Sequence, residues 1–531
     1  MSLRKSLAIA LGWLGVSLIS LASSRAQAPT SPQLPGQAPL AHEPGIASQA
    51  AKTNEPNDVA TRAIPAWLAA LPLAAQRGYR HLTESVYLPA DLDEEVFAFL
   101  IEGVEQRPPT LPLGSVPAGF SEPRVATFLK YGLTQRPGDA SDRPLQYVVT
   151  PNTESGSPAR WAMNCFACHG GSVYGQTLPG APNNLYQLQS FTEDVRAAKL
   201  RLSKPLTHMD MGSLVMPLGG TVGTTNAVMF GVALLNYRDA DLNVRPLRAS
   251  PHMLHHDMDA PPWWHFHRKR RLYADGFAEK GARGLMQFML VRENGPEKFR
   301  AWESDFEDVY EFIDSVRPPR YTGKIDWALA RQGQQAFDAH CARCHGSNSA
   351  PTDIAVAELA LSGTALGEEG GGNWRSLDFP EKLVPIDEIG TDRARLDSLT
   401  SEHRQHYGES WFAYSGAQDT WSDPGGYMAP PLDGIWASAP YLHNGSVPTL
   451  WHLLHPEARP ALWKRTVIEL DEQLVGLTVE QMTELPSSSS NRERRQIYDS
   501  RRFGKGNQGH DFPNELTEEQ REAVLEFLKT L

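Results

Sequence analysis

The sequence predicts a mainly α, loop-rich fold, and three observations lead to this prediction. The motif C-x-x-C-H occurs twice, at residues 165–169 and 341–345, and each copy marks a site of cofactor attachment. Apolar residues at helical spacing flank the second copy. The 41 prolines and 43 glycines indicate long loops between the helices, and no stretch shows strong strand periodicity.

The C-x-x-C-H motif is the attachment signal of a c-type haem. The two thiols form thioethers with the porphyrin, and the adjacent histidine binds the iron from one side. A structural zinc site is the alternative, but such a site usually adds two more cysteines or a spaced histidine pair. The two motifs contain all four cysteines of the chain. We therefore predict two covalently bound haem c groups, one at Cys165, Cys168 and His169 and one at Cys341, Cys344 and His345.

The N-terminus predicts export. Two basic residues precede an apolar run over residues 6–21, and an A-x-A cleavage site follows at residues 26–28. A membrane anchor is the alternative, but the run is barely long enough to span a bilayer. Residues 1–28 are predicted as a signal peptide, and residues 29–65 as a Pro- and Ala-rich flexible leader. Because haem c is attached outside the cytoplasm, we expect a periplasmic or secreted protein with no membrane span after cleavage.

Two haem domains are predicted after the leader. The run Arg317-Pro-Pro-Arg320 ends any helix before it and places a boundary near residue 320. Residues 66–320 then form the N-terminal haem c domain, and residues 321–531 form a C-terminal cytochrome c-like domain. The net charge of −12 argues against nucleic acid and anionic membrane surfaces as partners, but leaves room for a small basic redox protein.

Two amphipathic helices are expected around the second motif. Residues 325–340 run into it with apolar residues at helical spacing, and residues 516–531 close the chain behind a capping box of Thr517 and Gln520. Helices in these places resemble the first and last helices of the cytochrome c fold. The segment 151–164 before the first motif is too rich in Gly, Pro and Ser for a long helix, so the first haem domain is less regular.

The residue opposite each motif histidine decides what the haem does. A haem with both axial sites filled by protein transfers electrons, whereas a haem with an open site binds O₂ or peroxide. For the second haem, His510 is the favoured sixth ligand because it lies in a Gly-flanked loop just before the last helix. The alternatives in this half of the chain are His443, Met428, His452 and His455.

Two adjacent tryptophans, Trp263 and Trp264, follow two prolines and are held rigidly by them. They form either a packed aromatic corner or a π-system between the haems that carries an electron. The same region is crowded with histidines, which are either ligands of the first haem or part of a basic loop with residues 268–271. These histidines are His252, His255, His256, His265 and His267.

Three segments beyond the haem motifs resemble the bacterial di-haem cytochrome c peroxidases and their relative, the tryptophylquinone-forming maturase. Residues 223–227, G-T-T-N-A, resemble the R-N-x-P-T segment of the peroxidases, and residues 274–276, A-D-G, resemble their W-D-G turn. Residues 439–446, A-P-Y-L-H-N-G-S, with Thr449 and Leu450, are close to their A-P-Y-x-H-D-G-x…T-L segment.

Within this superfamily the chain is most similar to the rubber oxygenase branch. The pointers are residues 223–227, 261–264, 389–392 with Arg395, 439–446 and 509–510. The resemblance implies an N-terminal haem that binds O₂ beneath an apolar distal side lined by Phe, and a C-terminal electron-transfer haem held by two histidines. It makes His169 the proximal ligand of the reactive haem, His345 and His510 the pair on the second haem, Phe277 or alternatively Phe288 the distal residue, and Trp263 or Trp264 the aromatic between the haems.

Two departures from the peroxidases argue against a peroxidase. Ala274 stands where they carry the Trp of W-D-G, and Glu457 stands where they take a Met ligand. Gln287 and Glu293 nevertheless lie roughly where peroxidases place the group that assists O–O cleavage, so peroxidase chemistry stays open.

The resemblance implies an exported di-haem c-type oxidoreductase that activates O₂ at the N-terminal haem. Its substrate would be apolar and olefinic, such as polyisoprene, and would be cleaved at a C=C bond. The alternatives are a peroxidase or protein-modifying oxidase that uses H₂O₂, and an electron-transfer cytochrome without catalysis. The last is disfavoured because a cytochrome c unit needs only about 100 residues. Some relatives hold Ca²⁺ between their domains, which adds this ion as a further candidate cofactor.

Overall fold

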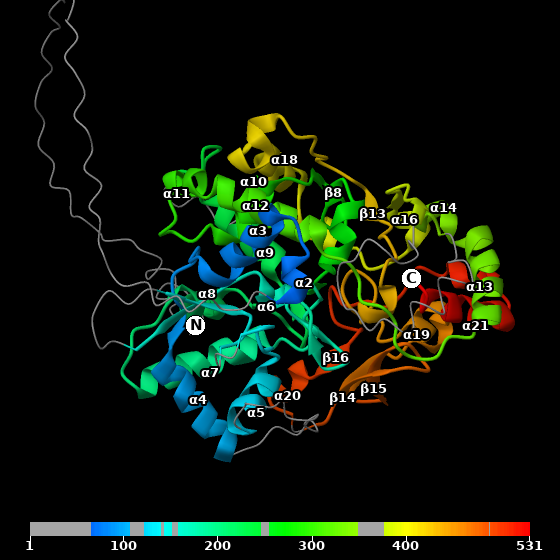
Figure 1. Cartoon of the computed structure of the whole chain (residues 1–531), viewed down its shortest axis with the longest axis horizontal. Helices are drawn as coiled ribbons and strands as arrows, with labels where there is room; N and C mark the ends of the chain where they lie inside the picture. Colours follow the sequence, from blue (N-terminus) through cyan, green and yellow to red (C-terminus); the bar gives the residue numbers. More distant parts are fainter. Residues whose placement is uncertain are drawn as a thin grey trace, which may run out of the picture. The chain divides into compact units, whose positions relative to one another are not determined.

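Helices and loops make up most of the described chain, as the sequence predicts (Figure 1). The computed structural model describes residues 65–106, 122–139, 143–150, 158–245, 254–348, 376–487 and 489–531. The predicted signal peptide, all but the last residue of the predicted leader, and His252 lie outside these ranges. Residues 63–531 group into one compact unit, and the division near residue 320 stays a prediction. Among the described residues, no helix combines the length and the apolar character needed to cross a bilayer.

The elements are short and follow one another through many loops. The helices of the N-terminal half are α2 (Ala66–Ala69), α3 (Leu73–Glu84), α4 (Glu94–Gln106), α5 (Glu122–Tyr131), α6 (Phe166–His169), α7 (Leu188–Arg201), α8 (His208–Val215), α9 (Ala227–Asn236), α10 (Ala282–Leu285), α11 (Pro296–Ala301) and α12 (Glu303–Ser315), with 3₁₀ turns η1 (Trp263–Arg268) and η2 (Met286–Met289). Those of the C-terminal half are α13 (Trp327–His340), α14 (Ala342–His345), α16 (Ile386–Ile389), α17 (Ala394–Ser398), α18 (Ser401–Glu409), α19 (Leu450–Leu454), α20 (Asn491–Arg495) and α21 (Glu518–Leu528), with η3 (Trp411–Gly416), η4 (Ile435–Ala437), η5 (Pro456–Ala458) and η6 (Phe512–Glu515).

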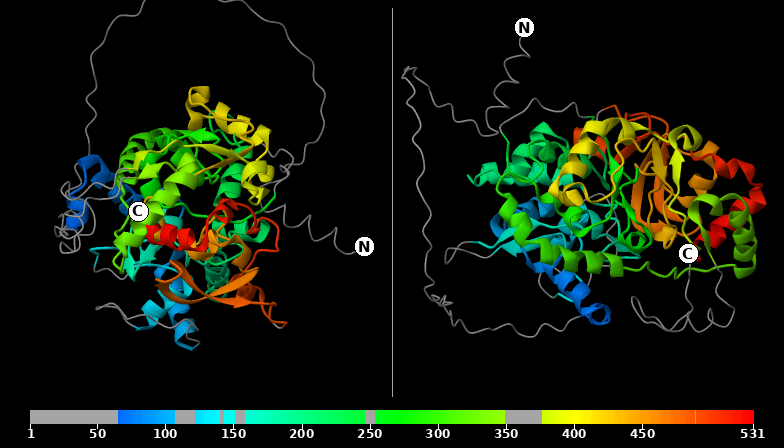
Figure 2. Two further views of the ribbon diagram at one scale, coloured as in Figure 1. Left: turned by 90° about the vertical axis from the view of Figure 1, so that its right-hand side faces the viewer. Right: turned by 90° about the horizontal axis from the view of Figure 1, so that it is seen from above.

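The two helices predicted around the second motif are both confirmed. Helix α13 begins at Asp326, whose carboxylate accepts from two backbone N–H groups of the first turn, and α21 begins with the predicted capping box at Thr517. The two helices pack side by side (Figures 1 and 2). Gly333 allows this close approach, because a Cβ there would overlap the backbone carbonyl of Ala523. The rings of Phe337 and Phe527 meet with centroids 5.3 Å apart.

A second helix pair, α3 and α12, supports the first motif. Gly78 lets the two helices approach closely, and the ring of Tyr79 meets that of Phe312 with centroids 5.4 Å apart. Helix α12 ends at Ser315, just before the Arg-Pro-Pro-Arg run that predicted a helix stop there. The first motif is preceded by strand β3 (Arg160–Met163) and not by a long helix, which also agrees with the prediction.

Two three-stranded sheets are present, although no stretch of the sequence shows strong strand periodicity. Strands β14 (Leu462–Asp471), β15 (Gly476–Met482) and β16 (Ile497–Asp499) form an antiparallel sheet in the order β15-β14-β16. Most residues of β14 are half-buried, so its sequence lacks the sharp apolar–polar alternation that identifies a strand. A second sheet has the order β1-β3-β2, with β1 at Leu92–Asp93 and β2 at Tyr147–Thr150.

The remaining strands are two or three residues long and form two-stranded sheets. They are β4 (Ser172–Val173) with β5 (Gln176–Thr177), β6 (Thr224–Thr225) with β7 (Met258–Asp259), β8 (Arg271–Leu272) with β9 (Ala278–Glu279), β10 (Ser347–Asn348) with β11 (Ser376–Asp378), and β12 (Leu383–Pro385) with β13 (Gly426–Met428).

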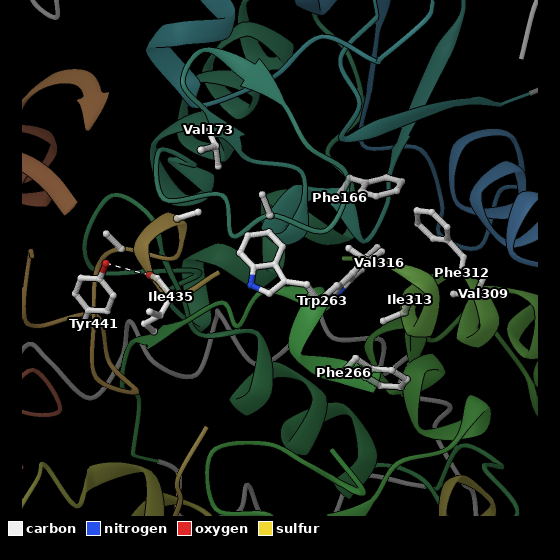
Figure 3. Packing of buried hydrophobic residues seen from close by; sticks show 14 of the residues in the cluster. Phe166, Val173, Trp263, Phe266, Val309, Phe312, Ile313, Val316, Ile435 and Tyr441 are labelled. Atoms are coloured by element: carbon white, nitrogen blue, oxygen red, sulfur yellow. Dashed lines mark hydrogen bonds between the residues drawn. The ribbon is translucent and has the colours of Figure 1, made fainter. Parts of the chain in front are cut away.

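The largest hydrophobic core joins residues from both sides of the predicted boundary. Phe166 of the first motif, Trp263 of η1 and Phe312 of α12 pack together, and Ile435 and Tyr441 belong to the same cluster (Figure 3). The hydroxyl of Tyr441 donates to the carbonyl of Ile435 at 3.1 Å. The surroundings of the first motif are therefore built in part by residues of the C-terminal half.

Candidate haem sites

The second motif follows directly on α13, and its histidine is fixed by one hydrogen bond. His345 lies at the end of α14, and its Nδ1 donates to the backbone carbonyl of Pro430 at 2.9 Å. Because Nδ1 carries the proton in this arrangement, Nε2 keeps a lone pair for a metal. A histidine that binds a metal is almost always fixed in this way by its other ring nitrogen.

His510 faces His345 at the separation expected of two axial ligands. Their ring centroids lie 6.2 Å apart. Two imidazoles that bind one metal from opposite sides, each with its nitrogen about 2 Å from the metal, have ring centres roughly 6 Å apart. Burial, followed by the nearby His345, lowers the pKa of His510 to about 3, so the ring is the neutral imidazole that metals bind.

The loop that carries His510 is held firmly by its backbone. The N–H of His510 donates to the carbonyl of Ile389 at 2.6 Å, and Arg459 donates to the carbonyls of Gly509 and His510 at 2.6 and 3.3 Å. Gly509 has a φ of +78°, and a Cβ there would overlap the backbone of Gly390, so only glycine fits. The Gly-flanked loop seen in the sequence thus has a steric reason.

The other candidates for the sixth ligand make different contacts. The ring of His443 stacks on Tyr427 at 4.3 Å, and Met428 packs against Gly276. His455 bonds to Glu518 at 3.0 Å. The ring nitrogens of His452 bond to Thr449 and Gln481 at 2.7 and 3.2 Å, and Glu457 pairs with Arg521 at 3.0 Å. His510 is therefore the candidate that the geometry favours.

The first motif repeats the same fixing bond on a different partner. The Nδ1 of His169 donates to the backbone carbonyl of Pro261 at 3.1 Å. Its ring stacks on Trp263 with centroids 4.9 Å apart and planes 26° from parallel. Burial lowers the pKa of His169 to about 4 and so keeps the ring neutral. All four motif cysteines are free of disulfide bonds, as thioether formation requires.

The two tryptophans lie between the surroundings of the two motifs. Trp263 contacts His169, whereas Trp264 packs against the C-terminal half: a Cβ at Gly434 would lie 3.0 Å from the Trp264 indole nitrogen. Gly434 lies in the same loop as Pro430, the residue that fixes His345. Trp264 is 1% exposed, so the pair is both a packed aromatic corner and a contact between the two halves.

Phe277 and Gln287 line one pocket. It encloses about 400 Å³ of empty space, part of it open to solvent, and α9 forms one wall with Val228, Gly231, Val232 and Leu235. The ring of Phe277 stacks on Tyr273 at 4.7 Å, and the amide of Gln287 donates to the Tyr273 hydroxyl.

The alternatives to Phe277 and Gln287 lie away from this pocket. Phe288 is 41% exposed and Glu293 is exposed, and neither lines it. The pocket lies near the first motif, because α9 follows Thr225, whose hydroxyl hydrogen-bonds to the Cys168 thiol.

A buried ion cluster supports this pocket, and sequence reasoning missed it as a cluster. Arg395 and Arg404 donate to the two carboxylate oxygens of Asp275 at 3.2 and 2.9 Å, and all three side chains are at most 3% exposed. Asp275 lies two residues before Phe277, so the cluster fixes the loop that carries this ring. Asp275 and Arg395 appeared in the sequence only within segments of family resemblance, and nothing there indicated that they pair.

Three of the crowded histidines of the N-terminal half bond to neighbouring groups, whereas the buried Nδ1 of His267 has no hydrogen-bond partner among the described residues. His265 bonds to the carbonyl of Asp433 at 2.9 Å, His255 to the Asn226 amide at 3.2 Å, and His256 to the carbonyl of Leu254 at 3.1 Å. Within the described ranges, no group of three or more His, Cys, Asp or Glu side chains is placed to hold a metal ion. Ca²⁺ therefore stays a prediction.

Comparison with known proteins assigns one part of the chain. Residues 426–464 match a family described as RoxA-like, cytochrome c-like. The uncharacterized protein y4iM of Sinorhizobium fredii is 32% identical over 216 residues, which are 38% of this chain and 45% of that protein. The uncharacterized protein y4iJ of the same organism is 27% identical over 265 residues, which are 41% of each chain. The aligned part thus spans less than half of either relative.

The matched segment contains part of the site geometry. It begins at β13, includes Pro430, which fixes His345, and ends within β14. A cytochrome c-like domain implies covalently bound haem c. The chain is thus related to the RoxA-like cytochrome c proteins through residues 426–464, and it fits a haem c oxidoreductase.

Proposed function

We propose that the protein is an exported di-haem c oxidoreductase that activates O₂ at the N-terminal haem and cleaves C=C bonds of an apolar, olefinic substrate such as polyisoprene. This proposal follows the rubber oxygenase branch of the di-haem peroxidase superfamily. The protein would act in the periplasm or outside the cell, and a small redox protein would exchange electrons with it.

The observation that carries the proposal is the difference between the two motif histidines. His345 faces a second imidazole, His510, across a centroid distance of 6.2 Å. On the side of the first motif, α9 begins two residues after Thr225, the neighbour of Cys168, and forms one wall of a pocket lined mainly by apolar and aromatic side chains. Bis-histidine ligation suits electron transfer, whereas an open and apolar distal side suits O₂ binding.

The pocket residues favour an apolar substrate. The aliphatic wall of α9 and the ring of Phe277 present few polar groups, and the amide of Gln287 is engaged by Tyr273. Burial raises the pKa of Tyr273 to about 12, so its hydroxyl keeps its proton at neutral pH and can donate a hydrogen bond. The haem iron itself would supply O₂ binding and the redox chemistry.

The tryptophan pair offers a path for electrons between the two sites. Trp263 stacks on the ring of His169, and Trp264 packs on the loop whose Pro430 fixes His345. Aromatic rings in contact with both sites place a π-system where an electron would pass. Either indole would serve as the aromatic between the haems.

A di-haem peroxidase or related oxidase is the second candidate, and Gln287 favours it. This side chain lines the pocket and is 8% exposed, in a place where peroxidases carry a group that assists O–O cleavage. The exposed position of Glu293 argues against it, because the carboxylate in this segment lies outside the pocket.

Spectroscopy of the purified protein tests the proposal. We expect one low-spin, six-coordinate haem and one haem that binds CO when reduced, together with an O₂ adduct. Two low-spin haems without a response to CO would contradict both enzyme assignments and favour an electron carrier. A haem that turns over H₂O₂ with a reduced cytochrome, but gives no oxygenated product from polyisoprene latex, would favour the peroxidase. Incorporation of both atoms of isotopically labelled O₂ into carbonyl products identifies the dioxygenase.

The variant His510→Ala tests the ligand assignment. We expect the second haem to change from low to high spin in the EPR spectrum while the first haem is unaffected. His455→Gln is the matched control, because this histidine belongs to the same half of the chain and bonds to Glu518. An unchanged spectrum for His510→Ala would reject His510 as the ligand.

A further inference from the structure

The buried cluster around Asp275 carries more positive than negative charge. One carboxylate meets two guanidinium groups, Arg395 and Arg404, at 3.2 and 2.9 Å. Arg395 is 0% exposed and Arg404 is 3% exposed, so water cannot balance the surplus charge. A buried charge without a partner is strongly unfavourable, and native proteins pair it or supply hydrogen-bond acceptors.

Arg395 also has unused hydrogen-bond donors. Its Nε and Nη1 are buried and have no hydrogen-bond partner among the residues that the structure describes. A guanidinium group has only donors, so these two N–H groups need an acceptor. Nη2 is already bonded to Asp275, and the two unused N–H groups lie on different sides of the guanidinium, so each can donate a hydrogen bond to a further acceptor.

Another buried arginine, Arg238, differs from Arg395 because its donors are satisfied by the backbone. Arg238 is 2% exposed and has no carboxylate partner in the described hydrogen bonds, yet its two terminal nitrogens donate to four backbone carbonyls at 2.6–3.1 Å. This fold therefore satisfies a buried guanidinium with its own backbone where no ligand is needed. No described carbonyl accepts a hydrogen bond from Nε or Nη1 of Arg395.

The two acidic side chains nearest to Arg395 along the chain have other partners, and the carboxylate of Asp397 pairs with Arg393 at 3.1 Å. The carboxylate of Asp392 accepts from the backbone N–H groups of Ala394 and Gly506 at 2.8 and 3.0 Å. The neighbouring buried pair of Lys505 and Asp257, 2.7 Å apart, is balanced within itself. The acceptor that these two donors need is therefore not among the described residues.

The position of Arg395 relates it to both haem sites. Its guanidinium lies 5.6 Å from the ring centre of Tyr273, which lines the pocket near the first motif. The backbone N–H of Met428 donates to the carbonyl of Ala274 at 2.7 Å, which joins the Asp275 loop to the segment that carries Pro430. Arg395 thus lies between the pocket and the loop that fixes His345.

We propose that an unused N–H donor of Arg395 binds a propionate of a haem c. Each haem carries two propionates, which are carboxylates on the porphyrin edge, and a guanidinium N–H donates a strong, charge-assisted hydrogen bond to a carboxylate oxygen. The inference rests on the haem-loading part of the proposed function and not on its O₂ chemistry. The propionate would balance the surplus charge of the cluster and connect the porphyrin to the loop that carries Phe277.

A crystal structure of the haem-loaded protein gives the direct test. We expect a propionate oxygen at hydrogen-bond distance from Nε or Nη1 of Arg395, and the haem that supplies it identifies the site served. Water or a protein carbonyl at these nitrogens would overturn the proposal. A purified chain without haem in a haem stain would instead refute the proposed function.

Redox titration of variants gives a second test in solution. In Arg395→Gln, the ratio of reduced to oxidised iron of one haem at a fixed potential should fall at least tenfold, which is a shift of 59 mV for one electron. The cause is the loss of a buried positive charge beside the porphyrin, which favours the oxidised iron. Arg393→Gln is the matched control: it removes the same charge two residues away, from a side chain that is 62% exposed, and should shift neither haem.

The variant Arg404→Gln separates the contact from the general charge effect. This variant removes a charge that pairs with Asp275 but leaves the Nε and Nη1 donors of Arg395 in place. The shift in haem potential should therefore be clearly smaller than in Arg395→Gln. Equal shifts in the two variants, or none in Arg395→Gln, would overturn the proposal. If the unaltered protein gives no oxidised product from latex while the variants show the expected redox shifts, the O₂ chemistry is refuted and the propionate site stands. If Arg395→Gln does not fold, the crystal structure decides alone.

Discussion

Replacing Asp275 with Asn should strongly destabilise the protein, because the carboxylate of Asp275 neutralises a cluster of two buried arginines. The pairs measure 3.2 and 2.9 Å, and the exposed fraction of the three side chains is 3% or less. Asn is nearly the same size as Asp, so the change creates no cavity and tests the charge alone. Removing one partner of a buried ion pair costs about 3–5 kcal/mol, because an uncompensated charge stays in the interior.

Urea unfolding of the haem-loaded variant measures this loss. We expect the midpoint to fall with an unchanged slope, which identifies a change in stability and not in the extent of unfolding. The matched control is Asp419→Asn. Asp419 also pairs with an arginine, Arg271, at 2.9 Å, but its side chain is 61% exposed. A pair with an exposed partner contributes about 0–1 kcal/mol.

The difference in stability loss between these two variants tests the role of the buried cluster. A loss below about 1 kcal/mol in Asp275→Asn would show that the two guanidiniums do not depend on this carboxylate. A loss as large in Asp419→Asn would show that any Arg–Asp pair of this fold matters equally. Either result would refute the role assigned to the buried cluster.

Three further changes test separate features. Gly333→Ala should destabilise the protein by about 1–3 kcal/mol in a thermal unfolding assay, because the added Cβ would overlap the carbonyl of Ala523. The control Gly103→Ala, on the open face of α4, should be neutral or stabilising in the same assay. Gly231→Phe should fill part of the pocket and slow the binding of CO to the reduced N-terminal haem by about tenfold or more, measured by flash photolysis. An unchanged rate of CO binding would exclude this pocket as the route to the haem. Burial lowers the pKa of His443 from 6.5 to about 3, so its contribution to stability is present above pH 6.5 and is lost as the pH falls. In His443→Leu the loss of unfolding free energy between pH 7 and 5 should be smaller by about 2 kcal/mol, and an equal loss would contradict the buried neutral state.

The sequence predicts the elements around the second motif better than those around the first, for a physical reason. The helices before and after the second motif carry local signals, a capping box and an apolar stripe, and His510 lies in a loop marked by glycines. These signals depend on neighbours in the chain. The pocket near the first motif depends instead on α9, α18 and the Asp275 loop, which lie far apart in the sequence.

Long-range pairing explains what the sequence could not predict. Asp275 is 120 residues from Arg395 and 129 residues from Arg404, so nothing local indicates their contact. The sheet of β14 and β15 was missed because half-buried strands lack clear alternation. The choice between Phe277 and Phe288 likewise needed the fold, which places only Phe277 in the pocket.

The two motifs fix their histidines in the same way. In each, the Nδ1 of the histidine donates to a proline carbonyl, Pro261 or Pro430, at 3.1 or 2.9 Å. Such a bond sets the tautomer and the basicity of a histidine that binds a metal, so these equal bonds would make His169 and His345 similar ligands of the two proposed haems. A difference in function must then arise on the opposite side, where one histidine faces His510 and the other lies near an apolar pocket. Variants of His510 and of the pocket should therefore change ligand binding more than variants of either proline segment.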